Sequence, residues 1–125
     1  MIERVLIVED DPITRDLLGD ACREAGFAVE SVAEGESALS AARRERPSVV
    51  VLDLHLPGLS GIEVLRRLAS EPSLTTVPVV IVSARLEPRL VQACTALGAY
   101  QALGKPVAPD VLTRTLRGAM GRVER

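Results

Sequence analysis

Five polar side chains of this sequence stand at or just after the ends of short apolar runs, and their types suit phosphoryl or metal chemistry. They are Glu9, Asp10, Asp53, Ser83 and Lys105. An apolar run without polar alternation, such as residues 49–52 before Asp53, is typical of a strand buried on both faces of a parallel sheet. Open α/β sheets bind ligands beyond the carboxyl ends of their strands. We therefore predict that these side chains meet at one edge of a sheet.

Asp53 has two interpretations when its own stretch is taken alone. It is followed by Pro57-Gly58, so its carboxylate could simply begin a turn. Alternatively, a carboxylate at the mouth of a buried strand can act as the nucleophile in a phosphoryl transfer. Residues 49–58 leave both interpretations open, and the other polar residues have to decide between them.

A group of acids in one crevice requires a cation, because like charges at short range repel one another. Mg²⁺ suits such a group, since it takes oxygen ligands from one or two carboxylates and keeps positions for phosphate oxygens. Lys105 offers a positive charge to a phosphoryl group, and the hydroxyl of Ser83 can donate a hydrogen bond to it. The sequence has no glycine-rich loop that would hold a nucleotide. We therefore expect the protein itself to carry the phosphoryl group, with Asp53 as acceptor.

Strand and helix patterns alternate along the whole chain. Strands are predicted over 5–9, 27–32, 49–53, 78–83 and 100–103, and helices over 12–25, 35–46, from Ser60 onward, 87–97 and 109–120. Each crossover between parallel strands must be right-handed and must cover the sheet. The pattern therefore predicts an α/β protein with a parallel sheet and helices on both faces.

Local signals define the ends and faces of two helices. Asp11-Pro12 is typical of an N-cap followed by proline at the first helical position, so we interpret Asp11 as a cap and not as a metal ligand. Ser60 and Glu63 have the spacing of a capping box. Apolar residues at helical spacing predict the buried face of the first helix, and they are Ile13, Leu17, Leu18, Ala21, Cys22 and Ala25.

Composition excludes several classes of protein. The chain of 125 residues, 47% of them hydrophobic, suffices for one domain with a single core. A net charge of -2, one Tyr, one Phe and no Lys/Arg run argue against binding of nucleic acid. No apolar run approaches the about 20 residues of a membrane span, and the chain starts without a signal peptide, so we expect a cytoplasmic location. Cys22 and Cys94 lack metal-ligand spacing and are interpreted as reduced core residues.

These motifs, taken in order, resemble the receiver domains of two-component response regulators. The resemblance extends from Val-Leu-Ile-Val-Glu9-Asp10-Asp11-Pro12 through Val-Leu-Asp53-Leu-His-Leu-Pro57-Gly58 and Val-Ser83-Ala84 to Gly-Lys105-Pro106. It implies a flavodoxin-like, doubly wound (βα)5 fold with a five-stranded parallel sheet in the strand order 2-1-3-4-5. We expect residues 1–125 to form a single receiver domain, with no output domain in this chain, which either acts by protein contact or is a piece of a longer protein.

The resemblance assigns a role to each site residue. Asp53 would take a phosphoryl group from the phosphohistidine of a histidine kinase or phosphotransfer protein. Asp10, Asp53 and the main-chain carbonyl of His55 would bind Mg²⁺, and Glu9 would reach the metal through water. Ser83 and Lys105 would contact the phosphoryl group, and the Lys105-Pro106 bond would be cis. The chain would be a signalling domain that catalyses only its own phosphotransfer and dephosphorylation, with a possible downstream protein target and no nucleic-acid or membrane partner.

The sequence departs from the family at position 102. Many receiver domains carry Tyr or Phe three residues before the lysine, where the ring turns inward as the Ser or Thr hydroxyl moves toward phosphate. This chain has Ala102, so the usual readout through the fourth helix, fifth strand and fifth helix is in doubt. Tyr100 is the candidate substitute, because alternation along a strand places it on the same side as Ala102.

Two other functions remain open on the sequence. A Mg²⁺-dependent aspartyl-phosphate phosphohydrolase also uses a strand-end Asp, but such enzymes need a second acid two residues later, where this chain has His55. A receiver-shaped interaction domain that is never phosphorylated would not require every phosphotransfer position to be filled. Labelling of Asp53 by a phosphodonor would exclude the interaction domain that is never phosphorylated, whereas the absence of a second acid at position 55 is what argues against the phosphohydrolase.

Overall fold

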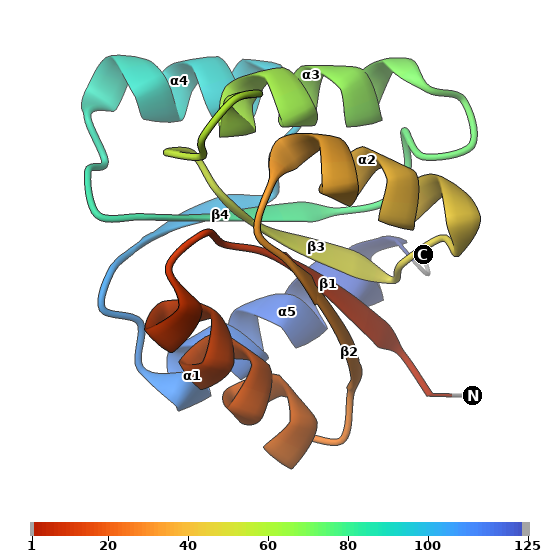
Figure 1. Ribbon diagram of the computed structural model, residues 1–125, viewed down its shortest axis with the longest axis vertical. Helices are drawn as coiled ribbons and strands as arrows, with labels where there is room; N and C mark the ends of the chain where they lie inside the picture. Colours follow the sequence, from red (N-terminus) through yellow and green to blue (C-terminus); the bar gives the residue numbers. More distant parts are fainter. Residues whose placement is uncertain (1, 124–125) are drawn as a thin grey trace.

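A five-stranded parallel sheet lies between two layers of helices in the computed structural model, which describes residues 2–123 (Figure 1). The strand order is β2-β1-β3-β4-β5, as the family resemblance implied, and all four strand pairs are parallel, as the alternation of strands and helices predicted. The strands are β1 (Arg4–Val8), β2 (Ala28–Val32), β3 (Val49–Asp53), β4 (Val79–Ser83) and β5 (Gln101–Gly104). The helices are α1 (Pro12–Glu24), α2 (Gly35–Arg44), α3 (Gly61–Ser70), α4 (Pro88–Ala96) and α5 (Pro109–Val123).

Each face of the sheet has its own hydrophobic core. On one face, α2, α3 and α4 cover Val50, Leu52 and Ile81, and on the other, α1 and α5 cover Val49 and Val51. Every residue of β3 and β4 is buried. Successive side chains of a strand point to opposite faces, so a strand covered on both sides needs apolar residues throughout. This explains why the central strands carry unbroken runs of Val, Ile and Leu.

Both predicted helix caps are present. The side chain of Asp11 accepts a hydrogen bond from the N–H of Thr14 at 2.8 Å, which confirms Asp11 as the N-cap of α1. Ser60 caps α3 by accepting from the N–H of Glu63 at 3.3 Å. The carboxylate of Glu63 pairs with Arg66 and Arg67, so it does not complete the reciprocal half of the capping box.

The predicted buried face of α1 was wrong for two residues. Ile13 is 71% exposed and Leu17 is 65% exposed, whereas Leu18 and Cys22 lie in the core. Ile13 and Leu17 are four residues apart and therefore share one helix face, which lies beside the buried stripe. The apolar pattern of α1 is wider than the surface that the sheet and α5 can cover. Two large apolar side chains therefore remain in solvent near the start of the helix.

Gly61 allows α3 to begin directly against the end of β3. A Cβ atom at this position would lie 2.2 Å from the carbonyl oxygen of Asp53 and 2.5 Å from the Cα of Leu54. The N–H of Gly61 donates to the carbonyl of Leu54 at 3.1 Å. Because any side chain would collide with backbone, only glycine permits this approach.

Two further sequence expectations concern the cysteines and membrane spans. Cys22 and Cys94 are free and buried, as predicted, and burial raises the pKa of Cys22 to about 11.

Within residues 2–123, no helix has the length and hydropathy needed to cross a bilayer.

Candidate functional site

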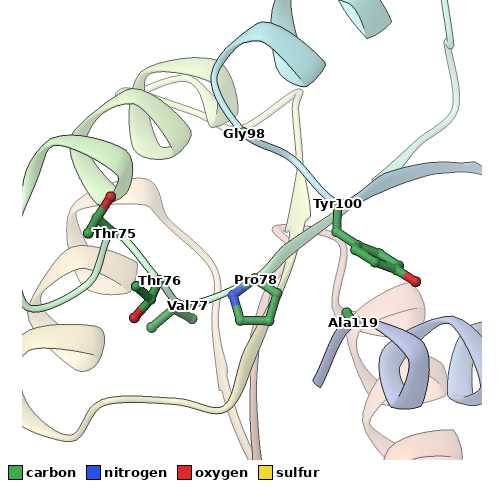
Figure 2. A pocket seen from close by; sticks show the side chains of 7 residues that line it. All are labelled: Thr75, Thr76, Val77, Pro78, Gly98, Tyr100 and Ala119. Carbon is green, nitrogen blue, oxygen red and sulfur yellow. The ribbon is translucent and has the colours of Figure 1, made fainter. Parts of the chain in front are cut away.

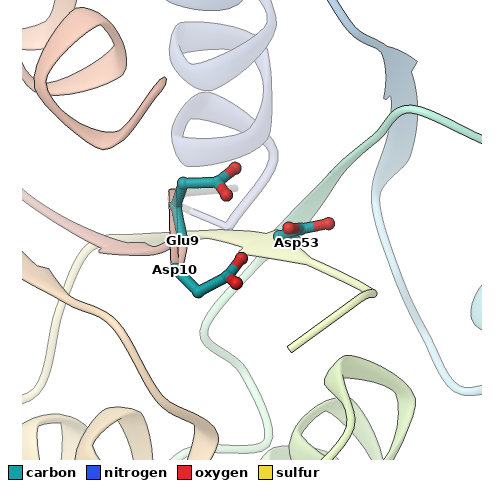
Figure 3. Close-up of side chains that lie close together, drawn as sticks. All are labelled: Glu9, Asp10 and Asp53. Atoms are coloured by element: carbon teal, nitrogen blue, oxygen red, sulfur yellow. The ribbon is translucent and has the colours of Figure 1, made fainter. Parts of the chain in front are cut away.

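Three carboxylates gather where β1 and β3 end (Figure 3). Oxygens of Glu9, Asp10 and Asp53 all lie within 4.8 Å of one another. The pairing of Val8 with Leu52 brings the ends of the two strands level, so the residues that follow are neighbours. Glu9 and Asp53 are buried, with 1% and 4% of their surface exposed, whereas Asp10 is exposed. The predicted convergence of these acids is therefore present.

Lys105 provides the positive charge within this group. Its Nζ lies 2.5 Å from Oε1 of Glu9 and 3.3 Å from Oδ2 of Asp53. The residue directly follows β5, so its side chain connects the ends of three strands. Buried carboxylates are costly unless a cation compensates them. We conclude that Lys105 makes burial of this pair of acids tolerable.

The pKa values of these groups reflect burial and their opposite charges. Burial raises the pKa of Glu9 above its ordinary value, and this effect outweighs the lowering by Lys105 and by the N–H of Asp11. Burial would lower the pKa of Lys105, but the carboxylates of Glu9 and Asp53 raise it by more. Lys105 therefore stays an ammonium ion at neutral pH and keeps its charge beside Asp53.

Ser83 lies next to the site, but its hydroxyl is directed to its own loop. The residue is fully buried, and its carbonyl accepts from the N–H of Lys105 at 2.9 Å. Its Oγ donates to the carbonyl of Arg85 at 3.1 Å and accepts from the N–H of Arg85 at 3.2 Å. Contact with a phosphoryl group on Asp53 would require Ser83 to exchange these bonds for a new one.

His55 contributes its backbone to the site. Its N–H donates to Oδ1 of Asp53 at 3.2 Å, and the residue is exposed. The bond fixes one carboxylate oxygen of Asp53 while Lys105 holds the other. A role of the His55 carbonyl in metal binding stays a prediction. The Lys105-Pro106 peptide bond is cis, as expected.

Arg15 is a site neighbour that sequence reasoning missed. Its Nη1 donates to the carbonyl oxygens of Glu9 at 3.0 Å and Asp10 at 3.3 Å. An arginine in the second turn of a surface helix has the pattern of a solvated residue, so the sequence contains no signal for this contact. The side chain reaches backward over the helix N-terminus to the loop that carries two of the acids.

The predicted position of Tyr100 was wrong. Ala102 packs with the core under α2, α3 and α4, whereas Tyr100 packs with the core under α1 and α5. Alternation holds only within a strand, and Tyr100 precedes β5 in a bend. Its hydroxyl lies over α5, where a Cβ at Gly118 would be 2.9 Å away. Tyr100 therefore cannot substitute for an aromatic ring at position 102.

Two cavities lie at opposite ends of the sheet. One of about 280 Å³ includes Tyr100 and Pro78 (Figure 2). It lies where β4 and β5 begin, whereas the acids lie where β1 and β3 end. The other, of about 260 Å³, lies between α1 and the segment after β5, and Leu17, Leu18, Val82 and Lys105 help to line it. The second cavity therefore joins the exposed face of α1 to the lysine of the site.

Comparison with known proteins identifies one family over most of the chain. A family model described as the response regulator receiver domain matches residues 5–117. The chain is 36% identical over 124 residues to the DNA-binding response regulator MtrA of Mycolicibacterium smegmatis, and the match covers 99% of this chain and 53% of that protein. The chain thus spans about half the length of the curated relatives that it matches.

Solved structures agree in fold over nearly the whole chain. The chemotaxis protein CheY4 of Vibrio cholerae has a TM-score of 0.91 and 28% identity, covering 95% of this chain and 99% of that one. The receiver domain of the sensor histidine kinase PA1611 of Pseudomonas aeruginosa has a TM-score of 0.89 and 27% identity, covering 97% and 99%. That structure has a magnesium ion coordinated in its active site cleft.

The ion pairs of Lys105 with Glu9 and Asp53 predict that loss of Lys105 destabilises the fold. We expect Lys105→Met to lower the free energy of unfolding by about 3 kcal/mol in metal-free buffer at neutral pH, because Glu9 and Asp53 would lose their buried cation. Urea unfolding followed by circular dichroism measures the change. The matched control is Arg67→Met, which removes an exposed pair with Glu63 and should cost less than about 1 kcal/mol. Equal losses for the two variants would contradict the compensating role of Lys105.

Proposed function

Because the chain belongs to the response regulator receiver domain family, we propose that Asp53 accepts a phosphoryl group from the phosphohistidine of a histidine kinase or phosphotransfer protein. The convergence of Asp53 with two further acids and Lys105 at one strand edge is the observation that carries this proposal. Receiver domains are signalling domains, and the chain would catalyse only its own phosphotransfer and dephosphorylation. We infer a cytoplasmic location, where such donors act.

The residues present suit Mg²⁺. Three carboxylates supply the oxygen ligands that this hard cation prefers, and the exposure of Asp10 leaves an open side. Asp10, Asp53 and the carbonyl of His55 would hold the ion, with Glu9 acting through water. When bound, Mg²⁺ supplies positive charge to the phosphoryl oxygens. The magnesium ion in the PA1611 receiver domain supports this assignment.

The chain's own residues prepare Asp53 for the transfer. The carboxylate attacks the phosphorus of the phosphohistidine, the P–N bond breaks, and its electron pair stays on the imidazole nitrogen. The product on the protein is an acyl phosphate. Lys105 and the N–H of His55 hold the two oxygens of Asp53, which limits the directions that the carboxylate can adopt. The ammonium of Lys105 also stabilises the negative charge that gathers beside Asp53.

The exposed face of α1 is a suitable contact for the phosphodonor protein. Ile13 and Leu17 stand in solvent, and Leu17 borders the same cavity as Lys105. A donor that brings its phosphohistidine to Asp53 has to cover this neighbouring surface. Exposed large apolar side chains gain free energy when a partner covers them. We infer that these residues contribute to binding of the donor.

The role of Asp53 predicts a loss of labelling in Asp53→Asn. The wild-type chain, incubated with Mg²⁺ and acetyl phosphate, should gain one phosphoryl group that is labile to base and hydroxylamine. The amide of Asp53→Asn is no nucleophile, so this variant should gain none in intact-protein mass spectrometry. Asp20→Asn, which changes an exposed carboxylate on α1, serves as the control and should be labelled as the wild type is. Persistent labelling of Asp53→Asn would refute the acceptor assignment.

The α1 contact predicts a defect that depends on the donor. We expect the double variant Ile13→Ser, Leu17→Ser to slow transfer about tenfold or more from a phosphorylated kinase or phosphotransfer protein that labels the wild type, because two apolar contacts are lost. Labelling by acetyl phosphate should not change, since both residues lie outside the site. Val111→Ser, which alters an exposed apolar residue of α5, is the control. A defect with acetyl phosphate as well would place the effect in the site.

Ala102 predicts a limited structural response. Phosphorylation shifts the equilibrium between two conformations of the domain only by the difference in its interaction energy with them. The methyl group of Ala102 offers little such difference. We expect beryllofluoride with Mg²⁺ to shift backbone NMR signals strongly in loops 54–60 and 84–87, where Ser83 must leave Arg85. Shifts around Ala102 and over 111–116 should be weaker. Large shifts throughout α5 would show that another movement replaces the aromatic switch.

A further inference from the structure

The backbone of the loop between β1 and α1 is held by Arg15. Strand pairing ends at Glu9, whose N–H donates to the carbonyl of Val32 at 3.0 Å, and α1 begins at Pro12. Asp10 lies between these points. It is exposed, and it belongs to neither the strand nor the helix, so their hydrogen bonds do not fix its backbone. The guanidinium of Arg15 binds the carbonyls of Glu9 and Asp10 through a single nitrogen, Nη1.

The contact involves the main chain of this loop, whereas the acidic cluster involves its side chains. The carboxylates of Glu9 and Asp10 turn toward Asp53, as Figure 3 shows, while their carbonyls accept from Arg15. A side chain's direction depends on the orientation of its own peptide plane. Holding both carbonyls therefore restricts where both carboxylates point. Arginine suits this task because the two N–H groups of Nη1 are fixed in the plane of a rigid guanidinium, whereas the three N–H groups of a lysine ammonium rotate at the end of a flexible stem.

We propose that Arg15 is a positioning residue of the metal site, which orients the carboxylates of Glu9 and Asp10 and so raises the affinity of the chain for divalent cations. The proposal rests on the proposed function, because it takes the acidic group to be a Mg²⁺ site. Partners that orient metal ligands commonly contribute about tenfold or more to metal affinity.

Electrostatic repulsion alone predicts the opposite effect of Arg15 on metal affinity. Arg15 places a positive charge beside a loop that would receive a cation, and like charges repel. If repulsion dominated, removal of the guanidinium would tighten metal binding. If orientation dominates, removal weakens metal binding. The direction of the change therefore separates the two effects without reference to phosphorylation.

The test is direct binding of Mn²⁺ to the full chain, followed by the loss of the electron paramagnetic resonance signal of the free ion and reversed by Mg²⁺. We expect Arg15→Met to weaken binding about tenfold. Arg15→Lys should lie between Arg15→Met and the wild type, because an ammonium can still donate to the carbonyls but lacks the fixed direction of the guanidinium N–H groups. Arg23→Met is the control, since Arg23 lies on the same helix and pairs only with Asp20 among the ion pairs formed in residues 2–123. It should bind as the wild type does.

Each outcome supports or overturns the positioning role. Unchanged or tighter binding by Arg15→Met, in a variant that remains folded by circular dichroism, overturns it. If Arg15→Met does not fold, Arg15→Lys decides, and wild-type affinity in that variant overturns the proposal. Absence of Mn²⁺ binding by the wild type overturns it as well. If the wild type binds Mn²⁺ with the expected order of variants but Asp53 is never labelled, the proposed function fails while the positioning role stands.

Discussion

The ammonium of Lys105 allows two acids to remain buried at the end of a hydrophobic sheet. Because β4 lies between β3 and β5, a residue after β5 must reach past β4 to meet Asp53 and Glu9. The long side chain of lysine makes this possible, and the small, buried Ser83 at the end of β4 leaves the path open. The strand order therefore favours a long side chain after β5 and a small one at the end of β4, so that Lys105 can reach the acid at the end of β3.

The loop that follows β1 is restrained on two sides. Lys105 binds the carboxylate of Glu9, and Arg15 binds the carbonyls of Glu9 and Asp10. One contact compensates charge and the other fixes backbone direction. Buried charges are costly unless their partners are well placed, so a mobile loop would weaken the compensation as well as any metal binding. The two basic residues, although they come from different parts of the chain, therefore act on the same few atoms.

Local patterns explain which features the sequence could predict. Unbroken apolar runs identified β3 and β4, and the alternation of strands with helices, together with the family resemblance, gave the strand order and the edge where Asp53 meets Glu9. The cap at Asp11 depends on residues that are neighbours in sequence, so it too was predictable. Burial of the cysteines followed from helical spacing.

The errors arose where a side chain's environment depends on a distant element. Helical spacing placed Ile13 on the predicted buried face of α1, but it gave no information on how much of α1 the neighbouring elements cover. Alternation placed Tyr100 with Ala102 because the strand was expected to begin one residue early. The contacts of Arg15 depend on how the chain turns between β1 and α1. Such features require the three-dimensional arrangement, and no local pattern encodes them.

The close approach at Gly61 couples the packing of α3 to the backbone of Asp53. The atom nearest to a Cβ at this position would be the carbonyl oxygen of Asp53, so any larger residue would push on the peptide unit that follows the side chain of the proposed acceptor. A substitution that improved the helix propensity of α3 would thus disturb the Asp53 carboxylate in the same step. A mutation of Gly61 therefore cannot change the stability of α3 without also changing the orientation of the Asp53 carboxylate. A chimera that takes α3 from a related domain would have to retain this glycine.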